Sequence, residues 1–284
     1  MITKLTYLPE LKRDELTEIT RLIVEEMQPA MVILFGSYAR NTWAEEVTQE
    51  DGINLLFKSD YDILVVTTRD LNHIANTKWQ KVQQKLKSRK YSTALSLIQH
   101  SAGYINNELK AGGYFFSDVI KEGKVIYTSG VDILGKPGNV DPVEVKKRAK
   151  EEFERWFQGA DEFLDVSNYS FEKELYSKAA FLLHQATESF YTAYLLVFTG
   201  YKGKVHDIEE LGTQVARIHP EFTSVFPMDS QFHIESFHKL KRAYVDARYK
   251  KDYTIGREEL TYLRERVEDL KLLVEKICKE RLKA

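Results

Sequence analysis

Two short stretches of the sequence carry side chains whose spacing suits phosphate chemistry. In LFGSYAR (34–40), an apolar run ends in Gly36 and Ser37, and such a turn into a helix lets backbone N–H groups and a hydroxyl approach a phosphate closely. In SDYDILV (59–65), Asp60 and Asp62 stand two residues apart, so on a strand they point to the same face. Paired carboxylates suit Mg²⁺ (or Mn²⁺), which takes further ligands from water and substrate phosphates. Together the motifs predict a site that holds a metal-bound nucleoside triphosphate for attack at its α-phosphate.

Each motif alone has a simpler interpretation. A lone Gly-Ser pair is nearly always just a turn, and Asp-x-Asp at a strand edge is often solvated surface. Arg40, close after the Gly-Ser pair, is either a positive group near the phosphates or an exposed helix residue. The prediction therefore rests on the joint occurrence of the two motifs, each beside a predicted strand of the same small unit.

The motifs need strands to position them, and the first 135 residues supply short runs rich in β-branched residues. From this composition we predict strands at MVILF (31–35), YDILVVTT (61–68), TALSLI (93–98) and KVIY (124–127). Apolar residues at helical spacing predict helices over 9–28 and 70–90. Residues 1–128 are therefore expected to form an α/β domain with a small mixed sheet and flanking helices.

LFGSYARN followed by SDYDILVV resembles the signature of the nucleotidyltransferase family of DNA polymerase β-like fold, particularly the minimal prokaryotic nucleotidyltransferases. The resemblance covers roughly residues 10–128. It implies that Gly36 and Ser37, with Arg40 beside them, contact the triphosphate of a nucleotide, expected to be ATP. It also implies that Asp60 and Asp62 bind the metal and are the catalytic carboxylates.

Two features depart from the pattern of this family. The stretch TWAEEVTQEDGINLLFK (42–58) looks like an insertion, which we interpret as a lid or an extended helix and loop. Its acidic residues, expected to form a solvated face, are Glu45, Glu46, Glu50 and Asp51. Active members usually supply a third carboxylate from a neighbouring strand, but YSTALSLIQHS (91–101) contains no acid, and the residues that could occupy the place are Ser96, Gln99 or His100. This loss is expected to weaken catalysis more than nucleotide binding.

Composition limits the class of protein. The chain has 284 residues, 43% of them hydrophobic and 30% charged, which is enough for two packed domains. A net charge of −2 argues against a globally basic nucleic-acid-binding protein. The single cysteine, Cys278, excludes an internal disulfide and a cysteine-based metal site. Without a signal peptide or an apolar run of membrane-spanning length, we expect a cytoplasmic protein with no membrane partner.

The second half of the chain has a pattern of helices alone. SGVDILGKPGNVDP holds three glycines and two prolines, and we interpret residues 129–141 as a linker. Beyond it, apolar residues at helical spacing predict helices from 142 to about 163, then over 172–199, 207–218, 230–250 and 256–282. Gly200 is expected to end one helix, and Asp207 with Glu210 to begin the next as a capping box. Residues 142–284 are therefore expected to form an all-α, up-and-down helical bundle.

Polar positions in this half resemble the HEPN family, a helical bundle often encoded beside, or fused to, minimal nucleotidyltransferases. In KAAFLLHQATESFYTAYLLVFTGYKGKVHDIEEL (178–211) the residues that carry the resemblance are Gln185, Ala186, Glu188, His206 and Asp207. We interpret His184 and Gln185 as a buried polar pair satisfied by neighbours rather than as ligands. HEPN bundles commonly pair, so the resemblance implies a homodimer through this half.

The motif of RNA-cleaving HEPN proteins is incomplete here. Many of them have an arginine, then four to six intervening residues, then a histidine, whereas Arg248 is followed by four residues and then Tyr253. Without an imidazole the usual general acid–base is missing. Ribonuclease activity is therefore not expected.

The segment HKLKRAYVDARYKKDY (238–253) interleaves basic and aromatic residues. Such a face can bind a phosphate and stack a base of a nucleotide or RNA, and its members are Arg242, Tyr244, Arg248, Tyr249 and Tyr253. The simpler interpretation is a solvated helix face with tyrosines packed on the bundle. Alternatively the tyrosine hydroxyls are acceptors, because some nucleotidyltransferases resembling this one transfer AMP to a tyrosine of a HEPN partner. Fusion would raise the effective concentration of such an acceptor.

Three functions are consistent with these residues. The first is a Mg²⁺-dependent enzyme that transfers a nucleotidyl group from a nucleoside triphosphate to a hydroxyl of a protein or RNA, in a toxin–antitoxin-like or regulatory setting. The second is a nucleotide-binding regulatory module without turnover. The third is an RNA-binding, toxin-like protein that acts through its helical half. The residues favour the first.

Overall fold

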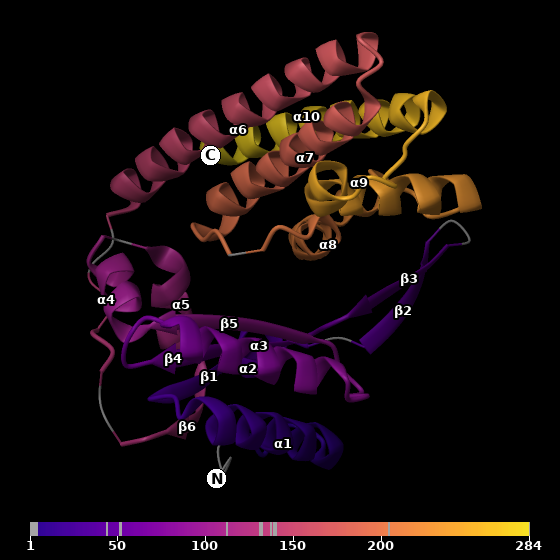
Figure 1. Cartoon of the computed structure of the whole chain (residues 1–284). Helices are drawn as coiled ribbons and strands as arrows, with labels where there is room; N and C mark the ends of the chain where they lie inside the picture. The colour runs from indigo at the N-terminus through magenta and orange to yellow at the C-terminus, as the bar shows by residue number, and fades with distance from the viewer. Residues whose placement is uncertain are drawn as a thin grey trace. The chain divides into compact units, whose positions relative to one another are not determined.

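A computed structural model of the chain divides into two compact units, Met1–Asp141 and Pro142–Ala284 (Figure 1). It describes residues 5–43, 45–50, 53–111, 113–130, 133–136, 138, 141–203 and 205–283, with the backbone alone for 45–50 and 53–58. Each unit has a hydrophobic core of its own.

The first unit is built on a four-stranded sheet in the order β5–β4–β1–β6. Its strands are β1 (Met31–Phe35), β4 (Tyr61–Thr67), β5 (Leu95–Ser101) and β6 (Lys124–Thr128). β1 runs antiparallel to both β4 and β6, whereas β4 and β5 are parallel. The predicted small mixed sheet is therefore confirmed.

Helices flank this sheet (Figure 1). On one face, α1 (Glu10–Met27) and α3 (His73–Lys87) bury apolar side chains in a core that includes Leu34 and Ile63. Phe35 follows Leu34 on the strand and so points to the other face, where its ring meets Phe115 edge-on at 5.7 Å. Phe115 belongs to α5 (Tyr114–Glu122), which follows α4 (Ala102–Lys110). The sequence patterns predicted neither of these last two helices.

The stretch between the two chemical motifs is a hairpin. β2 (Glu45–Glu50) and β3 (Ile53–Lys58) pair antiparallel, from Glu45 opposite Lys58 to Glu50 opposite Ile53. The expectation of an extended helix and loop is therefore wrong for the described part of this stretch. Asp51 and Gly52, which separate the strands in the sequence, form a dipeptide that favours hairpin turns, a signal that outweighs the charged residues around it. The expected solvated face of acids lies outside the described side chains.

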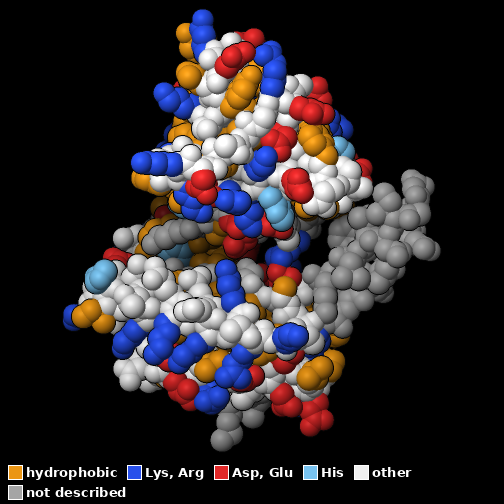
Figure 2. Space-filling view, turned by 45° about the vertical axis from the view of Figure 1, so that its right-hand side comes forward, with side chains coloured by type: hydrophobic (Ala, Val, Ile, Leu, Met, Phe, Trp, Pro, Cys, Tyr) orange, Lys and Arg blue, Asp and Glu red, His pale blue; other side chains and the backbone are white. Residues whose placement is uncertain are grey.

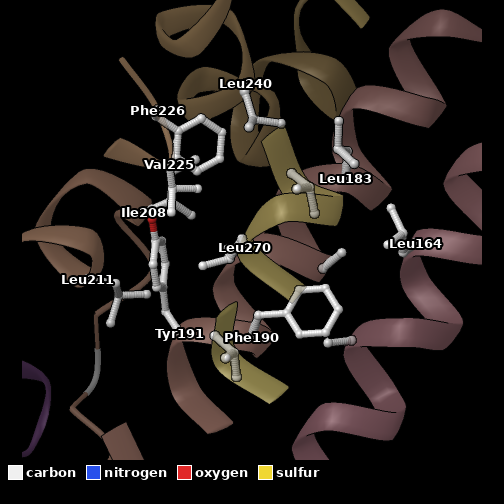
Figure 3. Close-up of a cluster of buried hydrophobic side chains, with 14 of the residues drawn as sticks. Leu164, Leu183, Phe190, Tyr191, Ile208, Leu211, Val225, Phe226, Leu240 and Leu270 are labelled. Carbon is white, nitrogen blue, oxygen red and sulfur yellow. The ribbon is translucent and has the colours of Figure 1, made fainter. Parts of the chain in front are cut away.

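The second unit consists of helices packed around a central one. They are α6 (Pro142–Glu172), α7 (Tyr176–Thr199), α8 (Ile208–Ile218), a 3₁₀ turn (Pro220–Ser224), α9 (Gln231–Tyr249) and α10 (Arg257–Lys283). α7 is the most apolar of them and is buried on most sides. In Figure 3 its side chains Leu183, Phe190 and Tyr191 lie among those of the surrounding helices, such as Leu240 and Leu270. The predicted helical bundle is confirmed.

Local signals set the ends of α7 and α8. Gly200 follows α7 with a φ of +63°, and its N–H donates to the carbonyl of Leu196. The Asp207 carboxylate accepts from the backbone N–H groups of Glu209 and Glu210 at the start of α8. Both predicted boundaries are confirmed.

The surface mixes charges of both signs. On the face shown in Figure 2, Lys and Arg side chains are interspersed with Asp and Glu, and the chain holds nearly equal numbers of the two signs. No helix within the described ranges combines the length and the apolar character needed to cross a membrane. Cys278 is buried, and burial raises the pKa of its thiol to about 12.

Candidate functional site

The two sequence motifs meet where β1 ends and β4 begins. Phe35 is the ladder partner of Asp62, so the next residue, Gly36, lies against the Asp62 carboxylate. A Cβ on Gly36 would come within 2.2 Å of Oδ2 and 3.1 Å of Cγ of Asp62. Gly36 also has a φ of +71°, in the left-handed region that side chains disfavour. Backbone conformation and available space therefore both require glycine here.

The two aspartates share one face of the sheet. Asp60 directly precedes β4 and is 9% exposed, and Asp62 is half-buried. Tyr61, between them, is fully buried on the opposite face in the core against α1. Because side chains alternate along a strand, this burial of Tyr61 directs both carboxylates to the face that carries Phe35.

Ser37 lies at the start of α2 (Gly36–Arg40), directly after the glycine that meets Asp62. Its hydroxyl has no hydrogen-bond partner among the residues that the structure describes, so it is available to a ligand. Arg40 lies at the other end of α2, about 6 Å along the helix axis from Gly36. Its Nη1 is 3.2 Å from Oε2 of Glu122, in an ion pair whose side chains are about half exposed. The structure thus brings Gly36, Ser37 and the aspartates together and places Arg40 in a separate surface pair.

The position beside Asp62 on the neighbouring strand belongs to Ser96. In the parallel ladder Ser96 is the partner of Asp62, whereas His100 is the partner of Val66. His100 is buried and stacks on Tyr104 with ring centroids 4.4 Å apart. Gln99 points the other way and donates to Thr67 Oγ1 at 2.9 Å. Of the residues considered for a third ligand, the register therefore leaves a serine hydroxyl in that place.

This donor set fits a divalent metal of the magnesium type. It consists of hard oxygens from the carboxylates of Asp60 and Asp62 and the hydroxyl of Ser96. Metals of this type often use one or two carboxylates and complete their shell with water and phosphate. Across the described side chains, no group of three His, Cys, Asp or Glu residues is arranged to hold a metal. A metal here would therefore depend on Asp60, Asp62 and the ligands that arrive with a nucleotide.

A further acid lies on α5. Asp118 is one helical turn before Glu122, the partner of Arg40. Partial burial raises the pKa of Asp118, the charge of Glu122 raises it further, and Lys121 and Arg40 act in the opposite direction. Because no helix was predicted over 114–122, sequence reasoning did not associate this carboxyl with the Gly-Ser turn.

In the second unit, a buried carboxylate ties the segment before α8 to α7. Glu188 is 5% exposed, and its Oε1 lies 2.9 Å from Nδ1 of His206. His184 is fully buried, with its ring nitrogens 3.0 Å from the Leu240 carbonyl and 3.2 Å from that of His206. Burial lowers the pKa of His184, against the opposing effects of these carbonyls and of Glu188. The interpretation of His184 as a buried, satisfied polar residue is confirmed, but that of Gln185 is wrong, because its buried Oε1 has no hydrogen-bond partner among the described residues.

The basic and aromatic face on α9 is smaller than its sequence indicates. Tyr253 is 9% exposed, and its hydroxyl donates to the carbonyl of Lys239 at 3.0 Å, so it belongs to the core. Arg242 is bound to Asp246, with Nη2 2.7 Å from Oδ2. Burial and pairing therefore remove two of the five residues from the expected face.

The other three residues of that face lie outside the core and form no ion pair within the described residues. The guanidinium of Arg248 lies over the ring of Tyr244 at 4.5 Å and near that of Tyr249 at 5.1 Å. Tyr244 also stacks on His206, with ring centroids 5.2 Å apart and planes 8° apart. Tyr249 is 73% exposed. Arg248 forms no ion pair within the part of the chain that the structure describes.

Comparison with known proteins matches the two units separately. Residues 17–130 match the family model described as polymerase beta, nucleotidyltransferase, and residues 153–280 match that of the HEPN domain. Among solved structures, an archaeal HEPN homologue matches with 17% identity and a TM-score of 0.32, over 44% of this chain and 97% of that one. A search of curated proteins found no match.

Proposed function

We propose that this chain, in which a nucleotidyltransferase domain of the polymerase β type is joined to a HEPN domain, binds a metal-bound nucleoside triphosphate and transfers its nucleotidyl group to a hydroxyl. The observation that carries the proposal is the approach of Gly36 to Asp62, which joins the two motifs in one site. We expect the nucleotide to be ATP and the metal to be Mg²⁺ or Mn²⁺.

The residues of the site have separate roles in this proposal. The Ser37 hydroxyl and the backbone N–H groups at the start of α2 donate to phosphate oxygens. Asp60 and Asp62 would hold the metal, which supplies positive charge to the triphosphate. In the transfer, the acceptor oxygen forms a bond to the α-phosphorus and its hydroxyl proton is released to water. The bond from the α-phosphorus to the α,β-bridging oxygen breaks, and pyrophosphate leaves with that electron pair. Gly36 keeps the space beside Asp62 free of a side chain.

Among the tyrosines first considered as acceptors, Tyr249 fits best. It is 73% exposed, so its hydroxyl can reach another active site or another molecule. The Tyr253 hydroxyl is buried and already donates to the Lys239 carbonyl, and Tyr244 is stacked on His206. We therefore propose Tyr249 as the protein acceptor to test first, with an RNA hydroxyl as the alternative.

A second candidate function is nucleotide binding without turnover. The observation that favours it is Ser96, because a hydroxyl beside Asp62 cannot replace the charge of a third carboxylate. Binding needs mainly the phosphate contacts and one metal, so it survives this change better than catalysis does.

Intact-mass measurement after incubation with ATP and Mg²⁺ tests the proposal. We expect a mass increase of one nucleotidyl unit or more on the wild-type chain, which Asp60→Asn and Asp62→Asn abolish. Asp14→Asn, an exposed acid on α1, is the matched control and should behave like the wild type. No added mass, together with Mg²⁺-dependent thermal stabilisation by ATP, would favour the binding module. Stabilisation that persists in both aspartate variants would show that the metal assignment is wrong.

A further inference from the structure

Each chemical motif has a tyrosine that turns away from the site. Tyr38 follows Ser37, and Tyr61 separates Asp60 from Asp62. Both tyrosines are fully buried, and their rings meet at 4.7 Å with planes 61° apart. The backbone that presents the hydroxyl of Ser37 is thus packed, through these two rings, against the backbone that presents the carboxylates.

Both tyrosine hydroxyls enter one polar cluster, which is buried at Lys12, Tyr38, Tyr61 and Thr93 and partly buried at Glu15 and Ser92. The Tyr61 hydroxyl donates to Oε2 of Glu15 at 2.8 Å, and the Tyr38 hydroxyl lies 3.2 Å from Oγ1 of Thr93. Burial and the Glu15 bond raise the pKa of Tyr61, so its hydroxyl stays protonated as a donor.

Charged side chains of α1 hold the cluster together. Nζ of Lys12 donates to Thr93 Oγ1 at 2.6 Å and to Ser92 Oγ at 2.9 Å. The Glu15 carboxylate accepts from the Ser92 hydroxyl at 2.8 Å and from the Ser92 backbone N–H at 2.5 Å. Ser92 therefore bridges the cation and the anion. Lys12 is 4% exposed and Thr93 2%, so the bond between them is shielded from water, whereas the bonds of Ser92 and Glu15 are partly buried.

Stability alone is a poor reason for this arrangement. A buried charge such as that of Lys12 loses so much hydration that an apolar side chain of similar size would be expected to stabilise the fold as well or better. Hydrogen bonds, unlike apolar contacts, depend strongly on direction and distance. The cluster thus fixes the positions of the two hydroxyls, and with them the positions of Ser37 and the aspartates one residue away in the chain.

We propose that Lys12, Glu15 and Thr93 are positioning residues, which hold the Gly36–Ser37 turn and the Asp60–Asp62 strand in the relation that nucleotide binding requires. The inference rests on the proposed function, since it concerns the same site. Other contacts of α2 support it. The Tyr7 hydroxyl donates to the carbonyl of Tyr38 at 2.8 Å, and Trp43 stacks on the Tyr38 ring at 5.2 Å.

Two substitutions of Thr93 separate positioning from packing. Thr93→Val keeps the shape of the side chain and removes the hydroxyl, whereas Thr93→Ser keeps the hydroxyl and removes a methyl group. We expect Thr93→Val to weaken binding of ATP with Mg²⁺ by about 10-fold, since small displacements of positioned groups are costly. Thr93→Ser should stay within about twofold of the wild type, because the hydroxyl that fixes position is retained.

Binding is measured by calorimetry well below the melting temperature of every variant, so that all are folded. Thr20→Val is the control, because it removes a buried hydroxyl of α1 that donates only to the Leu16 carbonyl and lies outside the cluster. Should Thr93→Val not fold, Tyr61→Phe removes the other end of the cluster and is expected to weaken binding to a similar degree. A wild-type protein that binds no ATP overturns both the proposed function and this inference. The inference alone is overturned if the wild type binds ATP and both Thr93→Val and Tyr61→Phe bind it equally well. It is also overturned if Thr93→Ser weakens binding as much as Thr93→Val does.

Discussion

Replacing Gly36 by alanine tests the approach of the two motifs most directly. The added Cβ has two consequences that can be separated. It places a side chain on a residue with φ of +71°, which costs about 1–2 kcal/mol of folding free energy in the left-handed region. It also puts a carbon 2.2 Å from Oδ2 of Asp62, closer than atoms in contact can approach, so the carboxylate must move by roughly 1 Å.

Gly130→Ala is the matched control for the first consequence. Gly130 has a φ of +89°, and nothing lies within 4 Å of the Cβ it would gain. Both variants should therefore lose about 1–2 kcal/mol from backbone strain, which lowers the Tm of a unit of this size by roughly 3–8 °C. Only Gly36→Ala should also disturb the site. A displacement of about 1 Å predicts a transfer rate lower by up to about 100-fold.

The assays are thermal unfolding, calorimetric binding of ATP with Mg²⁺, and nucleotidyl transfer followed by intact mass. A double substitution with Asp62→Ala relieves the close contact, because alanine at 62 removes Oδ2 and Cγ and leaves only the Cβ of residue 62, which is 3.3 Å from the new Cβ. In that background Gly36→Ala should cost no more than Gly130→Ala. The reasoning is refuted if Gly36→Ala, in the otherwise unchanged protein, binds ATP as tightly as the wild type and loses no more stability than Gly130→Ala.

Three further predictions concern single side chains. Ser96→Asp places a third carboxylate beside Asp62, so we expect Mg²⁺ to bind about 10-fold more tightly by titration calorimetry, and unchanged affinity would contradict the register. Asp118→Asn should raise the Tm at pH 7, because a carboxyl with a raised pKa in the folded state costs stability once it is ionised. This gain should vanish as the pH falls below about 4, where the acid is protonated in the folded and the unfolded chain alike, and an equal gain at pH 3 would point to a different cause. Cys278 should resist iodoacetamide at pH 8 until the protein is unfolded, since the thiol is buried and its pKa is raised to about 12; mass spectrometry detects the modification.

Features that depend on neighbours in the chain could be predicted from the sequence. The four strands of the sheet, the helices of the second unit, the end of α7 at Gly200 and the cap at Asp207 all follow from side-chain periodicity and backbone preference over a few residues. The pairing of Gly36 and Ser37 with the two aspartates was also predicted, because both motifs border apolar runs. These signals are local, so a single sequence carries them.

The burial of Lys12 is also indicated by the sequence around it. It stands at helical spacing with Leu16, Ile19 and Ile23, and all four residues are buried on α1. A lysine on the apolar stripe of a helix indicates a buried charge with partners elsewhere. The partners themselves, Ser92 and Thr93, are some 80 residues away and cannot be found from the spacing.

The tertiary structure decided everything that depends on register and burial. Strand register placed Ser96, rather than Gln99 or His100, beside Asp62. Packing buried Tyr253 in the bundle and left Tyr249 exposed, although both stand in the same basic segment. The sequence by itself thus determined which side chains could do chemistry and on which elements they lie. Which of them meet was decided by the long-range pairing of strands and the packing of helices, because the energies that select one register act between residues far apart in the chain.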